Sequence, residues 1–136
     1  MLLYYFEDRD DLLGALLGHV AARLARDLDA ITGRHPPNAL LDLLWTAALT
    51  PAFRSSMLLF LELGAAAGRG REPQRSAAAA IARDFAGWVA DRLDVAEADR
   101  AARAALLLAT LDGLFLLHAT GCEVEADAAA RLVTGA

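Results

Sequence analysis

The most restrictive feature of this sequence is the spacing of its apolar residues between positions 12 and 31. Leucine, valine and isoleucine recur there every three or four positions, at Leu12, Leu13, Leu16, Leu17, Val20, Leu24, Leu28 and Ile31. This spacing places them on one face of an α-helix, whereas a half-buried strand would alternate apolar and polar residues. Asp8 suits the N-cap, and Asp10 and Asp11 suit the positive end of the helix dipole. We therefore expect a long amphipathic helix over about 8–32.

Glycine, proline and acidic residues divide the rest of the chain into further helical segments. Gly33 closes the first helix, Thr50 and Pro51 have the N-cap and first-position arrangement, and Gly121 closes the fifth. Asp94 and Glu97 have capping-box spacing. The expected helices run over about 38–49 with Asn38 as the cap, from 51 to the loop "GRGRE", over 73–93, over 95–119, and over 127–133.

Composition supports the same fold class. Alanine and leucine are the commonest residues and favour helices, whereas valine, isoleucine and threonine, which favour strands, are sparse. A chain of 136 residues, 57% of them apolar, is long enough to bury a core in one domain. The predicted fold is an all-α bundle of five long helices with a short helix at its C-terminal end.

Charge and cysteine content restrict the partners and the compartment. The net charge is −5 with the acidic residues scattered, so the chain by itself is a poor nucleic-acid binder. Cys122 is the only cysteine, which rules out an intrachain disulfide and favours a reducing cytoplasm. The apolar stretch "AALLLATL" is far shorter than the roughly 20 residues of a membrane span, and the start lacks the basic region of a signal peptide. We expect a cytoplasmic protein without a membrane partner.

Catalytic and metal-binding motifs are absent from the sequence. His19, His35 and His118 lie on separate elements, and none has a ligating residue at metal-site spacing on the same helix face. No glycine-rich phosphate loop, nucleophile elbow or paired-carboxylate motif is found. We therefore expect neither an enzyme nor a metal or other cofactor.

Asp112 stands within the apolar stretch "LLLATLDGLFLLH" and allows two interpretations. It could be an acid that binds a ligand or a metal ion, because a buried carboxylate without a partner is costly. Alternatively it faces solvent or hydrogen-bonds to a neighbouring helix, while Gly113 permits close helix packing. We favour the second interpretation.

Large aromatic side chains are distributed over four of the expected helices. They are Trp45, Phe53, Phe60, Phe85, Trp88 and Phe115. Flat side chains from several helices can line an apolar cavity for a small molecule. They can equally fill an ordinary core, and the sequence does not separate the two.

The stretch "YYFEDRDDLLGALL" resembles a junction in TetR-family transcriptional regulators. In that family a recognition helix ends in an aromatic pair, a short turn follows, and a long helix begins with acids and leucines. Tyr5 and Phe6 match the aromatic pair, Asp8 the cap, Arg9 the basic position and Leu12 the first leucine. The family often has a tyrosine three residues before the phenylalanine, where this chain has Leu3, so a phosphate contact from that position is not carried over.

The resemblance extends less specifically over the rest of the chain. "FLELGAAAGRGREPQRSAAAAIARDFAGWVADRL" is similar to the family's helix, arginine-containing loop and proline-started helix with a tryptophan, and "AALLLATLDGLFLLHATG" to its last long helix. The resemblance implies that residues 1–7 are the remnant of the DNA-recognition helix and turn, with Tyr4, Tyr5 and Arg9 as remnants of the DNA-binding surface. Residues 8–136 would be the ligand-binding and dimerisation domain, and the first two helices of the DNA-binding unit would precede Met1.

The implied function is that of a bacterial ligand-responsive repressor, whose full-length form binds operator DNA. The fourth and fifth helices would pair with those of a second chain, with interface residues Ala77, Ala78, Ile81, Ala101, Ala105, Leu108 and Leu114. Small alanines allow close helix contact, and the fifth helix carries more leucines than one small monomer can bury.

An apolar or aromatic effector would bind among Leu17, Trp45, Phe53, Met57, Phe60, Phe85, Trp88, Phe115 and His118. Trp88 and His118 would supply the polar groups that orient it. The ligand would change the tilt of the first helix and so the spacing of two recognition helices. One alternative is a dimer that binds small molecules or proteins without DNA binding, and a second is an α-helical enzyme with an unrecognised site.

Overall fold

The computed structural model describes the backbone of residues 9–136, and the side chains from Ala15 onward except those of Leu16, Leu17 and Val20. The described residues form helices joined by short turns, with no strand beyond one isolated bridge between His35 and Leu93. The helices are α1 (Arg9–Leu28), α2 (Pro37–Ala48), α3 (Pro51–Gly68), α4 (Gln74–Asp91), α5 (Glu97–Ala119) and α6 (Glu123–Thr134). The predicted all-α class is confirmed.

Two predicted helix caps are wrong, and in each a distant part of the chain contacts the residue that was expected to cap. Asp94 does not cap α5: its backbone N–H donates to the carbonyl oxygen of His35 at 2.8 Å, and the helix begins only at Glu97, after Ala96. Asn38 does not cap α2, which begins at Pro37. Its side-chain amide instead donates to the Thr134 carbonyl oxygen at 3.3 Å and so ties α2 to the end of α6.

The other boundaries differ from expectation by a few residues. α1 ends at Leu28, where a turn leads to Gly33 with a φ of +76°, a conformation that favours glycine. α6 begins at Glu123, soon after Gly121, and is therefore longer than the expected 127–133. Glu123 and Glu125 in its first turn suit the positive end of the helix dipole.

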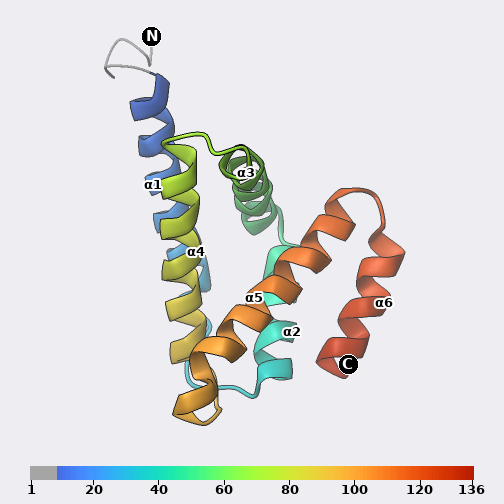
Figure 1. The fold of residues 1–136 in the computed structure, drawn as a ribbon. Coiled ribbons are helices and arrows are strands. Elements are labelled where there is room, and N and C mark those ends of the chain that lie inside the picture. The colour runs from blue at the N-terminus through green and yellow to red at the C-terminus, as the bar shows by residue number, and fades with distance from the viewer. Residues whose placement is uncertain (1–8) are drawn as a thin grey trace.

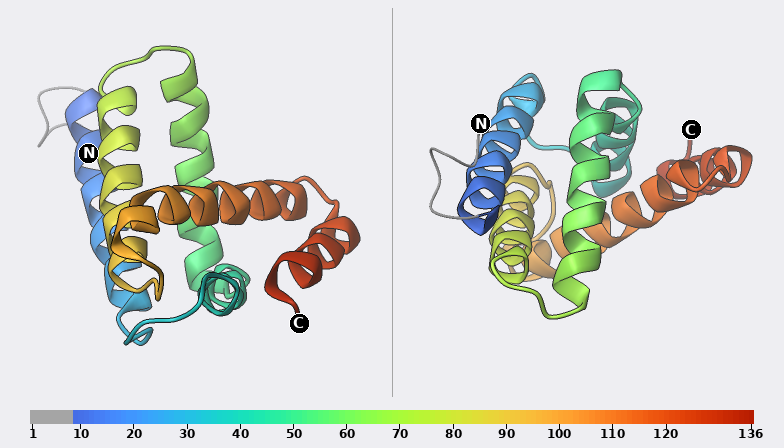
Figure 2. Two further views of the ribbon diagram at one scale, coloured as in Figure 1. Left: turned by 60° about the horizontal axis from the view of Figure 1, so that its bottom comes forward. Right: turned by 90° about the horizontal axis from the view of Figure 1, so that it is seen from above.

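The helices form two groups that share α5 (Figure 1). α4 packs against α1 and α3, and these three helices run roughly upright in the left view of Figure 2, with α5 crossing them. α6 lies at the far side of the molecule in Figure 1 and packs against α5 and α2. One end of α5 therefore meets α4, and the other end meets α6.

The core lies where α2, α5 and α6 meet. Among its fully buried members are Leu40, Leu44, Leu111, Phe115 and Ala126. These residues are the inward face of each amphipathic helix, and their burial is the main contribution to stability. The core continues towards α1 and α3, where a hollow replaces close packing.

α5 combines an apolar sequence with limited burial. By length and hydropathy alone it could cross a membrane, a test that core helices of soluble proteins also pass, and less than a third of its most apolar window is buried within the chain. Leu106 is 59% exposed and Leu116 51% exposed. A large part of the helix thus presents apolar side chains at the surface.

Candidate ligand pocket

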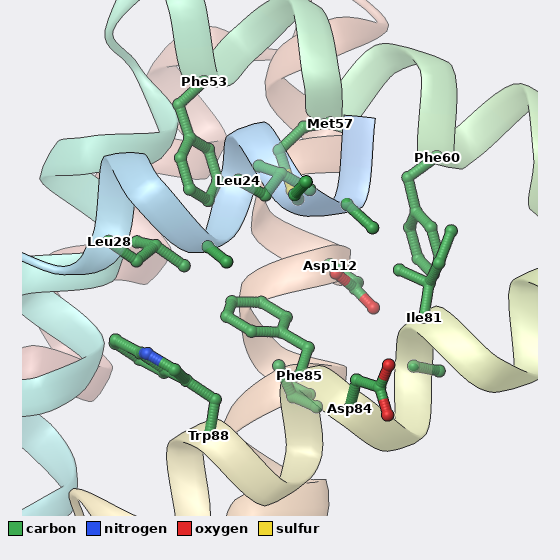
Figure 3. Close-up of a pocket in the computed structure, with 15 residues that line it drawn as sticks. Leu24, Leu28, Phe53, Met57, Phe60, Ile81, Asp84, Phe85, Trp88 and Asp112 are labelled. Carbon is green, nitrogen blue, oxygen red and sulfur yellow. The ribbon is translucent and has the colours of Figure 1, made fainter. Parts of the chain in front are cut away.

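A cavity of about 410 Å³ lies between α1, α3, α4 and α5 (Figure 3). Its volume falls within the roughly 300–1,000 Å³ that is typical of small-molecule sites. The described lining side chains are Ala21, Ala22, Leu24, Ala25, Leu28, Phe53, Met57, Phe60, Ile81, Ala82, Asp84, Phe85, Trp88, Leu108 and Asp112. Thirteen of these fifteen are apolar or aromatic, and the other two are aspartates.

The hollow follows from the size of the residues that face each other. α1 contributes Ala21, Ala22 and Ala25, whose methyl groups reach only a short way from the helix. The residues of α3 and α4 on the other side of the pocket include aromatic side chains, whose rings extend away from the helix backbone. Protein interiors are otherwise close-packed, so small residues opposite rigid rings leave a space where leucines would have filled it.

Two aromatic residues of α4 form one wall of the pocket. The ring centroids of Phe85 and Trp88 are 5.8 Å apart at an interplanar angle of 37°. The Arg92 guanidinium carbon lies 3.9 Å from the Trp88 ring centroid, in cation–π geometry. Arg92 also donates from Nε to the Ile31 carbonyl oxygen at 2.9 Å and from Nη1 to the Trp88 carbonyl oxygen at 3.2 Å. These contacts hold the tryptophan wall against the turn that follows α1.

The Trp88 indole N–H is buried and has no acceptor among the described residues. An unsatisfied buried donor costs roughly 1–3 kcal/mol, and the nitrogen is closed off by the surrounding side chains from a group in the pocket. Trp88 thus lines the pocket with its ring, and its predicted role in orienting a ligand through a polar group stays a prediction.

Asp112 is the less exposed of the two aspartates in the described pocket lining. It projects from α5 into the pocket, as Figure 3 shows, and is half-buried. Loss of hydration raises the pKa of its carboxyl group from 3.8 to about 6. The favoured interpretation of this region is wrong, because the Asp112 carboxylate points into the pocket and makes no hydrogen bond to a neighbouring helix among the described residues. Gly113 is exposed and a Cβ there would meet nothing within 4 Å, so it serves no close packing within the chain.

The pocket brings together five of the nine side chains that were predicted to bind a ligand: Phe53, Met57, Phe60, Phe85 and Trp88. The Leu17 side chain lies outside the described residues. The other three, Trp45, Phe115 and His118, do not belong to the pocket lining.

Those three side chains form a separate cluster between α2, α3 and α5. The Trp45 and His118 rings meet edge to face with centroids 5.9 Å apart. The Arg54 side chain donates from Nη1 to Nδ1 of His118 at 2.9 Å, and its guanidinium carbon lies 5.8 Å from the Phe115 ring centroid. His118 is therefore already engaged within the protein and does not orient a ligand in the cavity.

Helical phase explains the difference. Leu111, Phe115 and His118 follow one another at helical spacing on the face of α5 that meets α2 and α3, whereas Leu108 and Asp112 lie on the neighbouring face and line the pocket. The sequence-based prediction missed most of the α1 lining and also Ala82 and Asp84, and it assigned Ile81 and Leu108 to the dimer interface. It gave Asp112 as a ligand-binding acid only in the interpretation that was not favoured. The spacing of Ile81, Phe85 and Trp88 was the available signal for the α4 side.

The predicted dimer residues are distributed over several environments. Ala101 and Ala105 are exposed, Ala77 and Ala78 are partly buried, and Ile81 and Leu108 line the pocket. Leu114 is 5% exposed and belongs to the core of the single chain, so it has no side-chain surface to offer a partner. The physical reason is that α4 turns its apolar side towards α1 and α3, while the side of α5 that carries Leu114 faces the core of the single chain.

Of the DNA-binding remnant, Tyr4 and Tyr5 lie outside the described residues, and Arg9 begins α1 with its side chain not described. No group of three or more potential metal ligands occurs among the residues that the structure describes. Comparison of the chain with protein-family models, with curated proteins and with solved structures finds no match.

Proposed function

We propose that this chain is the effector-binding and dimerisation part of a TetR-like transcriptional repressor. The observation that carries the proposal is a small-molecule-sized cavity directly against α1. α1 is also the helix that follows the junction sequence resembling the family's link to its recognition helix. A ligand in this cavity would therefore contact the helix to which a DNA-reading unit would be joined.

The mechanism requires two arrangements of α1 that the ligand distinguishes. Leu24 and Leu28 of α1 reach the cavity from one side, and Phe53 and Met57 of α3 reach it from another. A ligand that fills the space between them favours the arrangement with the larger separation. Only this difference in affinity shifts the equilibrium, because a ligand that binds both arrangements equally shifts nothing.

A homodimer is the second part of the proposal, and the structure favours a surface on α5 and α6 over the predicted one on α4 and α5. Exposed uncharged residues recur along α5 and at its C-cap at alternating intervals of four and three: Ala102, Leu106, Ala109, Gly113, Leu116 and Thr120. On α6, Val124 is 77% exposed and Leu132 is 86% exposed. Alternating intervals of this kind form the contact stripe of packed helices in four-helix bundles.

A second copy of the chain suits this surface better than solvent does. Exposed apolar side chains that gather on two neighbouring helices mark an interaction site rather than an ordinary surface. Two such helices from each of two chains would complete a four-helix arrangement. Open space around Gly113 would let a partner helix approach closely.

The function is tested on a form of the protein that carries a DNA-binding unit. The proposal predicts an in-frame coding sequence upstream of Met1 for the helices of a helix-turn-helix. The extended protein should then select one sequence, with two related half-sites, from a random DNA pool, and a pocket ligand should release it. If the upstream sequence encodes no such helices, or if the extended protein selects no DNA sequence, the regulatory proposal fails and the alternative of a ligand-binding dimer without DNA binding takes its place.

A further inference from the structure

The charge in the pocket is of one sign and lies towards one end. Asp84 and Asp112 are the only charged residues among the described lining side chains, and no arginine or histidine accompanies them. In Figure 3 both carboxylates lie on the side of Phe60 and Ile81, whereas Trp88, Leu28 and Phe53 lie at the opposite side. The pocket thus has an acidic end and an apolar, aromatic end.

A half-buried carboxylate in apolar surroundings is an unfavourable arrangement for an empty pocket. Its ionised form has lost hydration and gains no compensating cation from the lining. A positive charge on a bound molecule would supply that compensation in a site where water screens charges less than it does at the open surface. The faces of Phe85 and Trp88 would add cation–π attraction and apolar contact for the remainder of the molecule.

We propose that the pocket binds a small organic cation with an apolar or aromatic body, its positive group beside Asp112 and its body against Phe85 and Trp88. This inference rests on the proposed ligand-binding function of the cavity. Asp84, which is exposed, lies at the outer part of the acidic end and attracts the cation more weakly.

The same arrangement makes binding depend on pH. Asp112 has a pKa of about 6 in the empty pocket, so a fall from pH 7.5 to pH 5 neutralises most of its charge. The charged groups that face it are limited, within the described lining, to Asp84 from α4, because α1 and α3 contribute only apolar side chains. A permanently charged ligand should therefore lose up to about tenfold in affinity over this range, since only the ionised fraction of Asp112 attracts it.

The test uses three probes that share one ring system and differ in charge. They are (2-naphthylmethyl)trimethylammonium, its neutral carbon isostere 2-neopentylnaphthalene, and 2-naphthylmethanesulfonate. Each probe is titrated with the whole chain at pH 7.5 and at pH 5, and its dissociation constant is measured from the change in the fluorescence of its naphthalene ring. We expect the cation to bind at least about tenfold more tightly than the isostere at pH 7.5, and the anion to bind least well.

Two matched variants identify the group responsible. Asp112→Asn keeps the shape of the side chain and removes its charge. It should lower the affinity for the cationic probe by about tenfold and abolish the dependence of that affinity on pH. Affinity for the neutral isostere should change by less than about threefold, which also shows that the variant pocket is folded. Asp91→Asn, on an exposed α4 position outside the pocket, is the control and should leave all three affinities unchanged.

The outcomes separate this inference from the proposal beneath it. If the isostere binds as tightly as the cation, or if Asp112→Asn affects both alike, the pocket is a ligand site but the inference of a cationic ligand is wrong. If none of the three probes binds the wild-type protein, both the inference and the ligand-binding role of the cavity are overturned.

Discussion

Replacing Asp112 with asparagine should stabilise the protein when its pocket holds no ligand, and this increase in stability should become smaller as the pH falls. The folded protein raises the pKa of this carboxyl from 3.8 to about 6 by burial. The folded state therefore binds the proton more tightly than the unfolded state does. The wild-type protein gains stability as the pH falls from above 6 towards 4, and it is penalised most above pH 6, where the buried carboxylate is ionised.

The size of the penalty follows from the two pKa values. The difference between 3.8 and about 6 corresponds to an upper bound of roughly 3 kcal/mol in the free energy of ionisation. Because the carboxylate is only partly buried, solvent screens it, and we expect Asp112→Asn to raise the free energy of unfolding by about 1–2 kcal/mol at pH 8. At pH 5 the gain should be roughly half as large, because most of the wild-type carboxyl is then protonated in the folded state.

Urea unfolding at pH 8 and pH 5, at one fixed protein concentration, measures both values. Fixed concentration matters because dimer formation would itself contribute to the apparent stability. Asp91→Asn, which replaces an exposed carboxylate of α4, is the control and should show no gain of this kind at either pH. A variant of Asp112 that is less stable than wild type at pH 8, or a gain that does not change with pH, would refute the assignment of a desolvated, unpaired carboxylate.

Three further predictions concern the cavity, the dimer surface and DNA. Met57→Trp should be tolerated, because the larger ring can enter the cavity, and it should block binding of 2-neopentylnaphthalene in fluorescence titrations. A decrease of about 1–3 kcal/mol in the free energy of unfolding, measured with urea, would instead indicate a filled core. Leu116→Glu, at an exposed position of the α5 stripe, should give a protein that is monomeric by light scattering and folded by circular dichroism. Leu114→Arg should instead unfold the chain, because Leu114 is buried. A dimer retained by Leu116→Glu would contradict the proposed surface. The chain without a helix-turn-helix should give no saturable, sequence-dependent complex in gel shifts at physiological salt, because its net charge is −5.

Local physical chemistry in the sequence determined the helical class and most of the helix positions. Helical spacing of leucines, Pro51 at the first position of α3 and the glycines after α1 and α5 act over a few residues, so they can be recognised without knowledge of the fold. The caps failed where a distant partner intervened. His35 engages the backbone of Asp94, and the end of α6 engages Asn38.

Only the tertiary structure decided which face of each helix does what. The same periodicity on α5 supplies Phe115 and His118 to one cluster and Leu108 and Asp112 to the cavity, and a rotation of about 100° per residue separates these faces. The sequence showed aromatic residues capable of lining a pocket, but the alanines of α1 that leave it open become significant only when α1 lies against α4. For the same reason, Asp112 changes from an isolated acid in an apolar stretch to a desolvated carboxylate at a pocket wall, because burial is a property of the packed helices and not of the residues next to it in sequence.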